Sequence, residues 1–350
     1  MRRLLRASKT GLRLLMDVLS LLRGWIVYAV SGTTPAVSYQ AFVRLFCHSG
    51  GVSNDLMTRA IAFIDRHQNL PEPGGQLGIG GVQQARVAAD HIREHGYFVF
   101  PQRLAEQTCE RLLRFSLSTP ATVRPMYGTP RPSMAKRAVY DRDHPEAVRY
   151  DFDCDDVLSC EDVQDLMINP SLLNVAQQYL GSMPIADVTS MWWHTAFSDR
   201  PDEEAAQYFH FDLDRVRWLK IFIYLTDVGP LSGAHCFVRG SHRTGGIPQA
   251  LLSRGYTRLA DHEVARHYSD DEIVEFLAPR GTILAEDTRG LHKGKAVRGG
   301  DRLMLQLQFS NSLFGGYYPP AAFRTMTAPL REMVAAYPIV YANYLGHGRR

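Results

Sequence analysis

Apolar positions change their spacing along the chain, and this change predicts the fold class. Up to residue 185 most apolar side chains recur at helical spacing, whereas from Ala186 they alternate or run continuously between turn residues, as in strands. The expected helices are 38–47, 54–67, 83–95, 105–115 and 160–180. The expected strands are 97–100, 186–197, 207–213, 218–227, 235–238, 272–276, 281–285 and 303–309. Helices first and strands later predict an α+β fold, in which helices pack on a double-sheet jelly roll.

The first 30 residues predict a basic amphipathic helix. Its apolar residues recur at helical spacing and are Leu5, Leu12, Leu15, Leu19, Leu22 and Ile26. Its basic residues are Arg2, Arg3, Arg6, Lys9, Arg13 and Arg23, against the single acid Asp17. The charges inside the apolar pattern argue against a membrane-spanning helix, and no cleavage site indicates a secretory signal. Two interpretations remain: a helix that lies on an anionic membrane surface, or a helix docked on the body of the protein.

A segment rich in Gly and Pro, residues 70–81, is the best candidate for a domain boundary. We therefore expect a helical extension over residues 1–82 and a jelly-roll domain over residues 83–325. A C-terminal helical tail is expected over residues 326–350. Residues 243–271 interrupt the strands, and we expect them to form an insertion over the mouth of the barrel.

Charge and cysteine content narrow the class of protein. The formal net charge is only +3, and the basic excess lies in the first 30 residues, so a nucleic-acid partner is not expected. The five cysteines have no C-x-x-C spacing, which argues against a disulfide framework or a thiolate zinc site. Scattered, reduced thiols of this kind indicate a cytoplasmic enzyme.

The strongest chemical signal is His210-Phe211-Asp212, followed further along the chain by His292. Alternate side chains of a strand share a face, so His210 and Asp212 can reach one ion while Phe211 packs behind them. Two imidazoles and one carboxylate, with the other positions open, are the ligand set of non-haem Fe(II) oxygenases. Arg302 follows on an apolar, strand-like segment, where its planar guanidinium suits the distal carboxylate of a 2-oxo acid. Arg298, in a turn, is the alternative.

Together these motifs resemble the phytanoyl-CoA dioxygenase family of iron- and 2-oxoglutarate-dependent oxygenases. The resemblance covers residues 84–314 and includes the strand end Leu225 to Val228 and the turn that ends in Gly240-Ser241-His242. It implies a jelly-roll fold with Fe(II), 2-oxoglutarate and O2 as cofactor and co-substrates. It also implies the metal ligands His210, Asp212 and His292, with Arg302 holding 2-oxoglutarate.

Four further residues are candidates for cofactor binding. Gln207 matches a position of the family motif just before His210. Lys220 lies in an apolar strand on the face of the metal motif, and we expect it to contact a carboxylate of cosubstrate or substrate, or to reach solvent from an edge strand. Of the neighbouring Trp192 and Trp193, one is expected to line the pocket and the other to lie in the core. We assign the pocket position to Trp193. Ser310 offers a hydroxyl contact.

The favoured function is hydroxylation of an aliphatic C–H bond of a small-molecule or lipid-linked substrate, such as a sugar or glycolipid, with release of succinate and CO2. The carboxylate of Asp212 argues against halogenation, because related halogenases have a small residue there, whereas desaturation and ring closure stay open. Two alternatives are a cupin-like metal-dependent isomerase or hydrolase, and a non-catalytic, membrane-docked binding protein on the same scaffold.

Arginines in the loops expected at the barrel mouth, 118–150, 198–206 and 243–271, indicate an anionic substrate or, equally, a solvated face. These arginines are Arg131, Arg137, Arg142, Arg149, Arg200, Arg243 and Arg254. Combined with the basic leader, they favour a cytoplasmic enzyme at the inner face of a membrane, where it acts on an envelope glycolipid or sugar.

Overall fold

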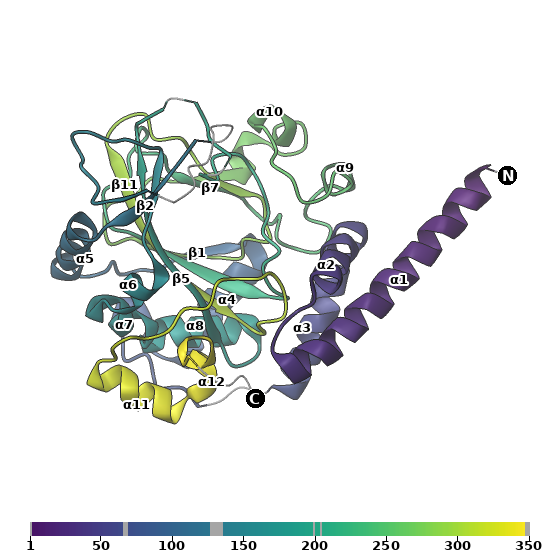
Figure 1. Ribbon diagram of the computed structural model, residues 1–350, viewed down its shortest axis with the longest axis horizontal. Coiled ribbons are helices and arrows are strands. Elements are labelled where there is room, and N and C mark those ends of the chain that lie inside the picture. The colour runs from purple at the N-terminus through teal and green to yellow at the C-terminus, as the bar shows by residue number, and fades with distance from the viewer. Residues whose placement is uncertain (1, 66–68, 127–135, 199, 204, 347–350) are drawn as a thin grey trace.

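Two antiparallel β-sheets face each other in the computed structural model of the chain (Figure 1). The structure describes residues 2–65, 69–126, 136–198, 200–203 and 205–346. The larger sheet has the order β1 (Tyr97–Val99), β9 (Ile283–Glu286), β6 (Trp218–Tyr224), β11 (Asp301–Ser310), β5 (Ile185–Thr195), β4 (Arg149–Asp151), β2 (Ala121–Arg124), β3 (Arg137–Ala138). The smaller sheet has the order β10 (His292–Gly294), β7 (His235–Val238), β8 (Ile273–Phe276). This arrangement confirms the predicted jelly-roll class.

Strand parity in the larger sheet separates a hydrophobic core from the space between the sheets. β5 and β11 pair antiparallel over most of their length. Trp193, Leu303 and Leu305 point into the core beneath the helices. Trp192 and Met304, the alternate residues, pack with side chains of the smaller sheet instead. The space between the sheets is therefore lined by one parity class of each strand.

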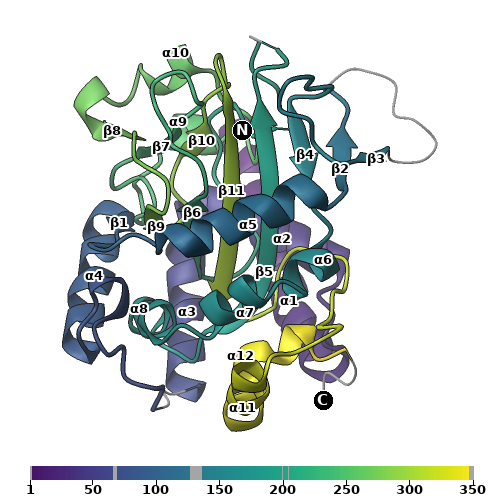
Figure 2. The same cartoon turned by 90° about the vertical axis from the view of Figure 1, so that its left-hand side faces the viewer.

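Helices cover the outer face of the larger sheet (Figure 2). They are α4 (Val82–His95), α5 (Glu106–Ser118), α6 (Cys154–Leu158), α7 (Glu161–Met167), α8 (Pro170–Leu180), α11 (Ala328–Ala336) and α12 (Pro338–Tyr341), with the short 3-10 helices Gln76–Gly78 and Ala342–Tyr344. A further 3-10 helix, Asp270–Glu272, leads into β8 of the smaller sheet. The sequence of α8 fixes both of its ends, because Asn169 caps it, Pro170 occupies the first turn and Gly181 takes the left-handed conformation. Leu330 and Val340 from the C-terminal helices belong to the same core. The boundaries at residues 82 and 325 stay predictions.

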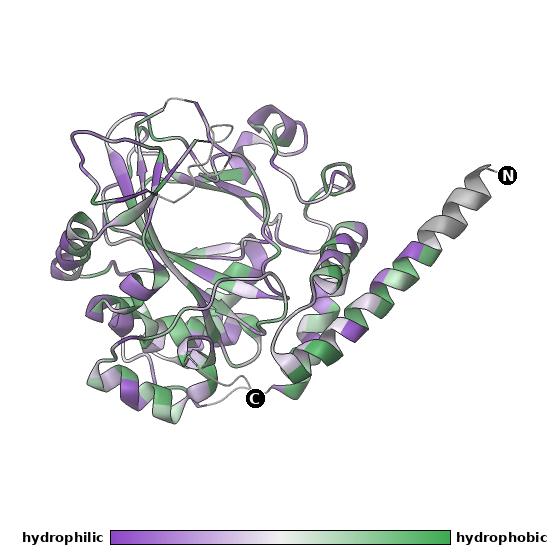
Figure 3. Ribbon diagram, in the orientation of Figure 1, coloured by the Kyte–Doolittle hydropathy of each residue, from purple (hydrophilic) through white to green (hydrophobic). Residues whose placement is uncertain are grey.

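Three N-terminal helices lie on the opposite side of the molecule: α1 (Arg2–Ser31), α2 (Ala36–Ser49) and α3 (Val52–Ile64) (Figures 1 and 3). The C-terminal half of α1 is docked, because Trp25 stacks on Phe314 with ring centroids 4.2 Å apart. The buried carboxylate of Asp17 accepts hydrogen bonds from Arg44 of α2, at 3.1 and 2.5 Å. From the docked end, α1 extends away from the body toward its N-terminus (Figure 1).

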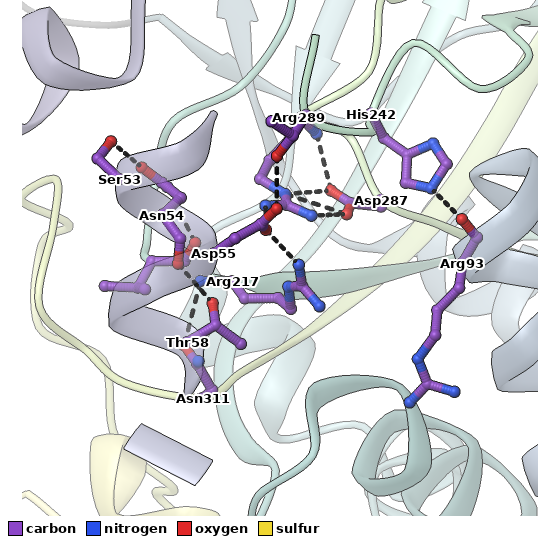
Figure 4. Close-up of polar contacts among 12 residues, drawn as sticks. Ser53, Asn54, Asp55, Thr58, Arg93, Arg217, His242, Asp287, Arg289 and Asn311 are labelled. Carbon is purple, nitrogen blue, oxygen red and sulfur yellow. Dashed lines mark hydrogen bonds and ion pairs between the residues drawn. The ribbon is translucent and has the colours of Figure 1, made fainter. Parts of the chain in front are cut away.

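A group of charged side chains, two of them buried and two partly exposed, joins α3 to the sheets, and we call it the α3 network (Figure 4). It consists of Asp55, Arg217, Asp287 and Arg289. Arg217 contacts Asp55 at 2.7 Å, and Arg289 contacts Asp55 at 3.3 Å and Asp287 at 2.6 Å. The hydroxyl of Tyr179 on α8 donates to Asp287. The network therefore connects α3 with both sheets and with α8.

The segment that carries His210 differs from its prediction. A strand is expected over residues 207–213, but only two isolated bridges occur there, Phe209 with Leu259 and His210 with His292. The next ordered contact of the segment is the amide of Asp212 with the carbonyl of Thr288, at 2.8 Å. Because the segment changes partners along its length, no continuous ladder forms. Its partner Leu259 belongs to the predicted insertion, which carries the short helices α9 (Gln249–Leu252) and α10 (Asp261–Val264).

Candidate metal centre

His210, Asp212 and His292 come together between the two sheets, and one donor atom from each lies within 4.8 Å of the others. Reciprocal backbone hydrogen bonds of 3.0 and 2.9 Å hold His210 against His292, which begins β10. The Nε2 atom of His292 lies 3.4 Å from Oδ2 of Asp212, and Nε2 of His210 lies 3.8 Å from Oδ1. All three side chains are buried. The structure thus brings together the ligand set that the sequence predicts.

Both histidines are oriented by their backbone surroundings. Nδ1 of His210 lies 2.9 Å from the carbonyl of Tyr208, and Nδ1 of His292 lies 2.9 Å from the carbonyl of Gly290. A carbonyl only accepts, so each Nδ1 carries the proton and each Nε2 presents a lone pair to the centre. Burial lowers the pKa of His210 well below its usual range, which keeps that imidazole neutral. A neutral, pre-oriented imidazole is the form that binds a metal.

Asp212 is held in its charged form by a neighbouring lysine. Nζ of Lys220 lies 2.6 Å from Asp212 and 3.3 Å from Asp214. Burial acts to raise the pKa of Asp212, but the charge of Lys220 outweighs burial and holds that pKa well below its usual range. The donor set is one carboxylate and two imidazoles that line an open space, and it fits Fe(II). Lys220 itself is buried and contacts two carboxylates of the protein.

A cavity of about 1230 Å³ lies over this centre. Its walls include Phe222 of β6, Trp192 of β5 and Met304 of β11, all on the inner face of the larger sheet. Its far end reaches Thr33, between α1 and α2, and Tyr318, in the segment after β11. The N-terminal helices and the C-terminal segment therefore contribute to the cavity as well as to the core.

Arg302 is a buried cation of this cavity. Its side chain leaves β11 toward the space between the sheets, and its Nη2 donates to Nδ1 of His194 at 2.7 Å. Its Nε and Nη1 atoms are buried without a hydrogen-bond partner among the described residues. Burial lowers the pKa of Arg302 from its usual value. Arg298, the alternative at the sequence level, is exposed in the preceding loop and does not line the cavity.

The remaining candidates lie outside the cavity. Trp193 is in the hydrophobic core beside Tyr140, and Trp192 lines the cavity in its place, because parity on β5 is fixed by the pairing with β11. The side-chain oxygen of Gln207 accepts from the amide of Asp202 at 2.8 Å. Ser310 donates to Asp187 at 2.8 Å. The side chains of Gln207 and Ser310 therefore bond to other residues of the protein and do not face the cavity.

One pair in the cavity wall was not singled out from the sequence. Nε2 of His235, on β7, lies 2.8 Å from Oε2 of Glu286, at the end of β9. Burial raises the pKa of Glu286 to about 8 and lowers that of His235 well below its usual range. At neutral pH the pair is therefore a protonated carboxyl that donates to a neutral imidazole. The only sequence signal is that a strand pattern places His235 and Glu286 on apolar, buried strands.

Comparisons with known proteins agree with this geometry. A family model described as phytanoyl-CoA dioxygenase (PhyH) matches residues 92–304, which include His210, Asp212, His292 and Arg302. No curated protein matches the chain.

Solved structures with similar folds share little sequence with the chain. HygX from Streptomyces hygroscopicus, with nickel and 2-oxoglutarate bound, is 17% identical over 70% of this chain and 93% of its own, with a TM-score of 0.48. The epimerase SnoN, in complex with Fe3+, alpha ketoglutarate and nogalamycin RO, is 17% identical over 65% and 84%, with a TM-score of 0.44. The carbocyclase SnoK from nogalamycin biosynthesis is 14% identical over 69% and 87%, with a TM-score of 0.44.

Proposed function

The chain belongs to the phytanoyl-CoA dioxygenase family and is a 2-oxoglutarate-dependent oxygenase, and we propose that it hydroxylates an aliphatic C–H bond of a small-molecule or lipid-linked substrate. Enzymes of this family use Fe(II), 2-oxoglutarate and O2. Bound together, these supply the oxidising power that protein side chains lack. In the overall reaction one oxygen atom of O2 becomes the new hydroxyl and the other enters succinate, while the cosubstrate loses CO2.

His210, Asp212 and His292 are the proposed metal ligands. Their Nε2 atoms and carboxylate converge from one side, so the opposite side stays open to the cosubstrate and O2. The carbonyls of Tyr208 and Gly290 fix both imidazoles in the tautomer that coordinates. Lys220 keeps the Asp212 carboxylate charged and, with Asp214, limits its rotation. Because a carboxylate fills this position, hydroxylation is favoured over halogenation.

Arg302 is the proposed receptor for the distal carboxylate of 2-oxoglutarate, and it is the observation that carries the proposal. A guanidinium that is 1% exposed, with Nε and Nη1 unpartnered among the described residues, is costly unless an anion joins it. The cavity that Arg302 lines also contains the metal ligands. His194 accepts from Nη2 at 2.7 Å and holds the plane of the guanidinium, so its other nitrogens are preorganised for a bidentate anion.

Anaerobic titration of the purified protein with Fe(II) and 2-oxoglutarate tests these roles. A weak metal-to-ligand charge-transfer band in the visible is expected, and His210→Ala and Arg302→Ala should each abolish it. His262→Ala, at an exposed histidine, is the matched control and should keep the band. A folded, iron-bound wild type without the band would contradict the proposal and favour a cupin-like isomerase or hydrolase.

We also propose that α1 contacts the inner face of a membrane. The helical segment Gly11–Ser31 is long and apolar enough to span a bilayer by length and composition, and 17% of its apolar 18-residue stretch is buried inside the protein. The exposed apolar side chains lie at helical spacing: Leu12, Leu15, Met16, Leu19, Leu22, Ile26 and Val30. The acid Asp17 is buried against Arg44, so it does not interrupt this face. The basic residues Arg2, Arg3, Arg6 and Lys9 precede it in the sequence.

Flotation with vesicles of phosphatidylglycerol and phosphatidylcholine tests this contact. Wild-type protein is expected to float, and Leu19→Asp/Ile26→Asp should remain with the free protein, because both positions are exposed and the change leaves the core intact. Val139→Asp, at an exposed apolar position outside α1, is the control. If the double variant floats like wild type, or if the wild type only self-associates through α1, the membrane contact is wrong.

A further inference from the structure

Most basic side chains in the cavity already have an acidic partner. Six arginines of the described chain line it: Arg124, Arg149, Arg215, Arg258, Arg302 and Arg324. Arg124 and Arg149 pair with Asp151, Arg215 pairs with Asp187, and Arg324 pairs with Asp155 and Asp156. Lys220 pairs with Asp212 and Asp214. Within the described residues, Arg258 and Arg302 have no carboxylate partner.

Arg258 stands beside the metal ligand His210. The backbones of Phe209 and Leu259 exchange hydrogen bonds of 3.0 and 2.8 Å, and both side chains are buried in the hydrophobic cluster under α2. Neighbouring residues of paired extended segments point to the opposite side, so Arg258 and His210 both face the cavity.

The insertion that carries Arg258 is held in place by its own contacts. The hydroxyl of Tyr268 donates to the carbonyl of Gly246 at 2.6 Å, and Glu263 accepts from the amide of Ala260 at 2.8 Å. Among the described residues of this insertion, 243–271, Arg258 is the one that lines the cavity. The half-buried guanidinium makes no hydrogen bond or ion pair with any described side chain. The insertion therefore fixes the backbone position of Arg258, whose guanidinium keeps its donors free for the cavity.

Arg258 and Arg302 reach the cavity from different walls. Arg302 comes from β11 of the larger sheet, whereas Arg258 comes from a segment that extends the smaller sheet beyond His210. Arg302 is 1% exposed, which suits a ligand enclosed on all sides. Arg258 keeps part of its surface in contact with solvent, which suits a larger molecule that enters from outside.

We propose that Arg258 binds an anionic group, a carboxylate or a phosphate, of the organic substrate. This inference rests on the proposed function, in which Arg302 is already assigned to the cosubstrate. A guanidinium binds either anion through two parallel hydrogen bonds, so it fixes orientation as well as position. Because Arg258 adjoins His210, an anion held there places the neighbouring part of the substrate beside the metal centre. The substrate is accordingly an acid or a phosphate ester.

Calorimetric titration of the full-length, Ni(II)-loaded protein, saturated with 2-oxoglutarate, tests the proposal without turnover. Inorganic phosphate and acetate are the probes, titrated separately to distinguish the two anions. Arg258→Gln should weaken binding of the preferred probe at least about tenfold, as expected for a lost charge-assisted pair. It should change the affinity for 2-oxoglutarate less than about twofold. Arg254→Gln, which removes an exposed cation of the same insertion that does not line the cavity, is the matched control and should leave both affinities unchanged.

Three results would overturn the assignment. The first is that the wild type binds neither probe. The second is that Arg258→Gln binds both probes as tightly as the wild type does. The third is that Arg258→Gln loses affinity for 2-oxoglutarate, as is expected of Arg302→Gln. The last result would make Arg258 part of the cosubstrate site. Failure of the proposed function gives a different result. In that case the wild type binds neither Ni(II) nor 2-oxoglutarate, but it still binds phosphate and loses this binding on Arg258→Gln. The protein would then have the anion site without the oxygenase chemistry.

Discussion

Two groups of charged side chains in this protein each contain buried members, and they differ in whether each charge has a partner. In the α3 network two aspartates face two arginines, and each charge contacts an opposite one within 3.3 Å. In the cavity, Arg302 is equally buried but has only a neutral histidine beside it, and Arg258 has no acidic partner among the described residues. One group is electrically complete, and the other has a cationic excess.

The difference separates a structural role from a binding role. Burying an unpaired charge is costly, so a protein that only needed stability would neutralise Arg302 as it neutralises Arg289. The α3 network is saturated and can only hold α3 against the sheets. In the cavity, two cations lack an anionic partner, and three side chains of the types that bind metals face one another. An anion and a metal would supply the missing partners. Exchange of charged for neutral side chains in the two groups should therefore affect different properties.

The largest effect is expected in the α3 network. Asp287→Asn leaves the guanidinium of Arg289, whose side chain is 3% exposed, with Asp55 as its remaining acidic contact, at 3.3 Å. Removing one member of a buried pair costs about 3–5 kcal/mol of unfolding free energy. Equilibrium denaturation in urea measures the loss. The double variant Asp287→Asn/Arg289→Met removes the stranded cation and should recover part of it. A single variant within about 1 kcal/mol of wild type would show that the network is not structural.

A smaller effect, on a different property, is expected at Arg302. Arg302→Met should leave the stability of the ligand-free protein unchanged or raise it, because the side chain it removes is a buried charge without a carboxylate. Affinity for 2-oxoglutarate should fall about 100-fold or more, roughly 2.7 kcal/mol. Thermal unfolding of the Ni(II)-loaded protein with and without 2-oxoglutarate measures both. If the variant is destabilised and still stabilised by 2-oxoglutarate, the contrast between the two groups fails.

The sequence predicts the parts of this picture that are local. The periods of apolar residues place most helices and strands, and the motif His210-x-Asp212 with His292 predicts the three residues that come together in the candidate metal centre. The sequence also shows which residues of one strand share a face. Which of the two faces lines the cavity depends on how the strand pairs with its neighbour. Trp193 was therefore expected to line the cavity, and the pairing of β5 with β11 places Trp192 there instead.

Partners far apart in the sequence are what the pattern cannot supply. Asp55 and Arg289 are joined across most of the chain, and nothing near either residue indicates the other. The loop positions of the arginines predict free cations at the cavity mouth, yet Arg142 pairs with Asp301 and Arg254 pairs with Glu263. Arg131 lies outside the described residues. Whether an arginine is free for a ligand depends on whether an aspartate reaches it, and this is a property of the three-dimensional structure.

A pH-dependent effect is expected next to the α3 network, at His242. Its Nε2 lies 3.1 Å from the carbonyl of Arg93, and burial lowers its pKa to about 4 (Figure 4). The folded state therefore keeps this imidazole neutral, whereas the unfolded chain protonates it near pH 6.5. The stability it contributes is complete above pH 6.5 and is lost as the pH falls toward 4, at up to about 1.4 kcal/mol per pH unit.

His242→Gln removes that proton uptake and keeps a donor for the Arg93 carbonyl. The unfolding free energy of the variant should fall less steeply than that of wild type between pH 6 and about 4.5. Urea denaturation at several pH values measures both slopes, and the other buried histidines contribute equally to each protein. Identical slopes would mean that His242 is protonated in the folded state, against the burial that the structure gives it.

The smallest effect is expected where charge is paired but exposed. Arg254 and Glu263 form an ion pair in the insertion, and the Arg254 side chain is 42% exposed. Water and salt screen such a pair, and the energy gained offsets little more than the lost side-chain entropy. Arg254→Gln should leave the melting temperature and the affinity for 2-oxoglutarate unchanged. A loss like that of Asp287→Asn would mean that ion pairing itself, and not burial, distinguishes the charges on which this fold depends. The same variant should also leave phosphate binding intact, because Arg254, unlike Arg258 in the same insertion, does not line the cavity.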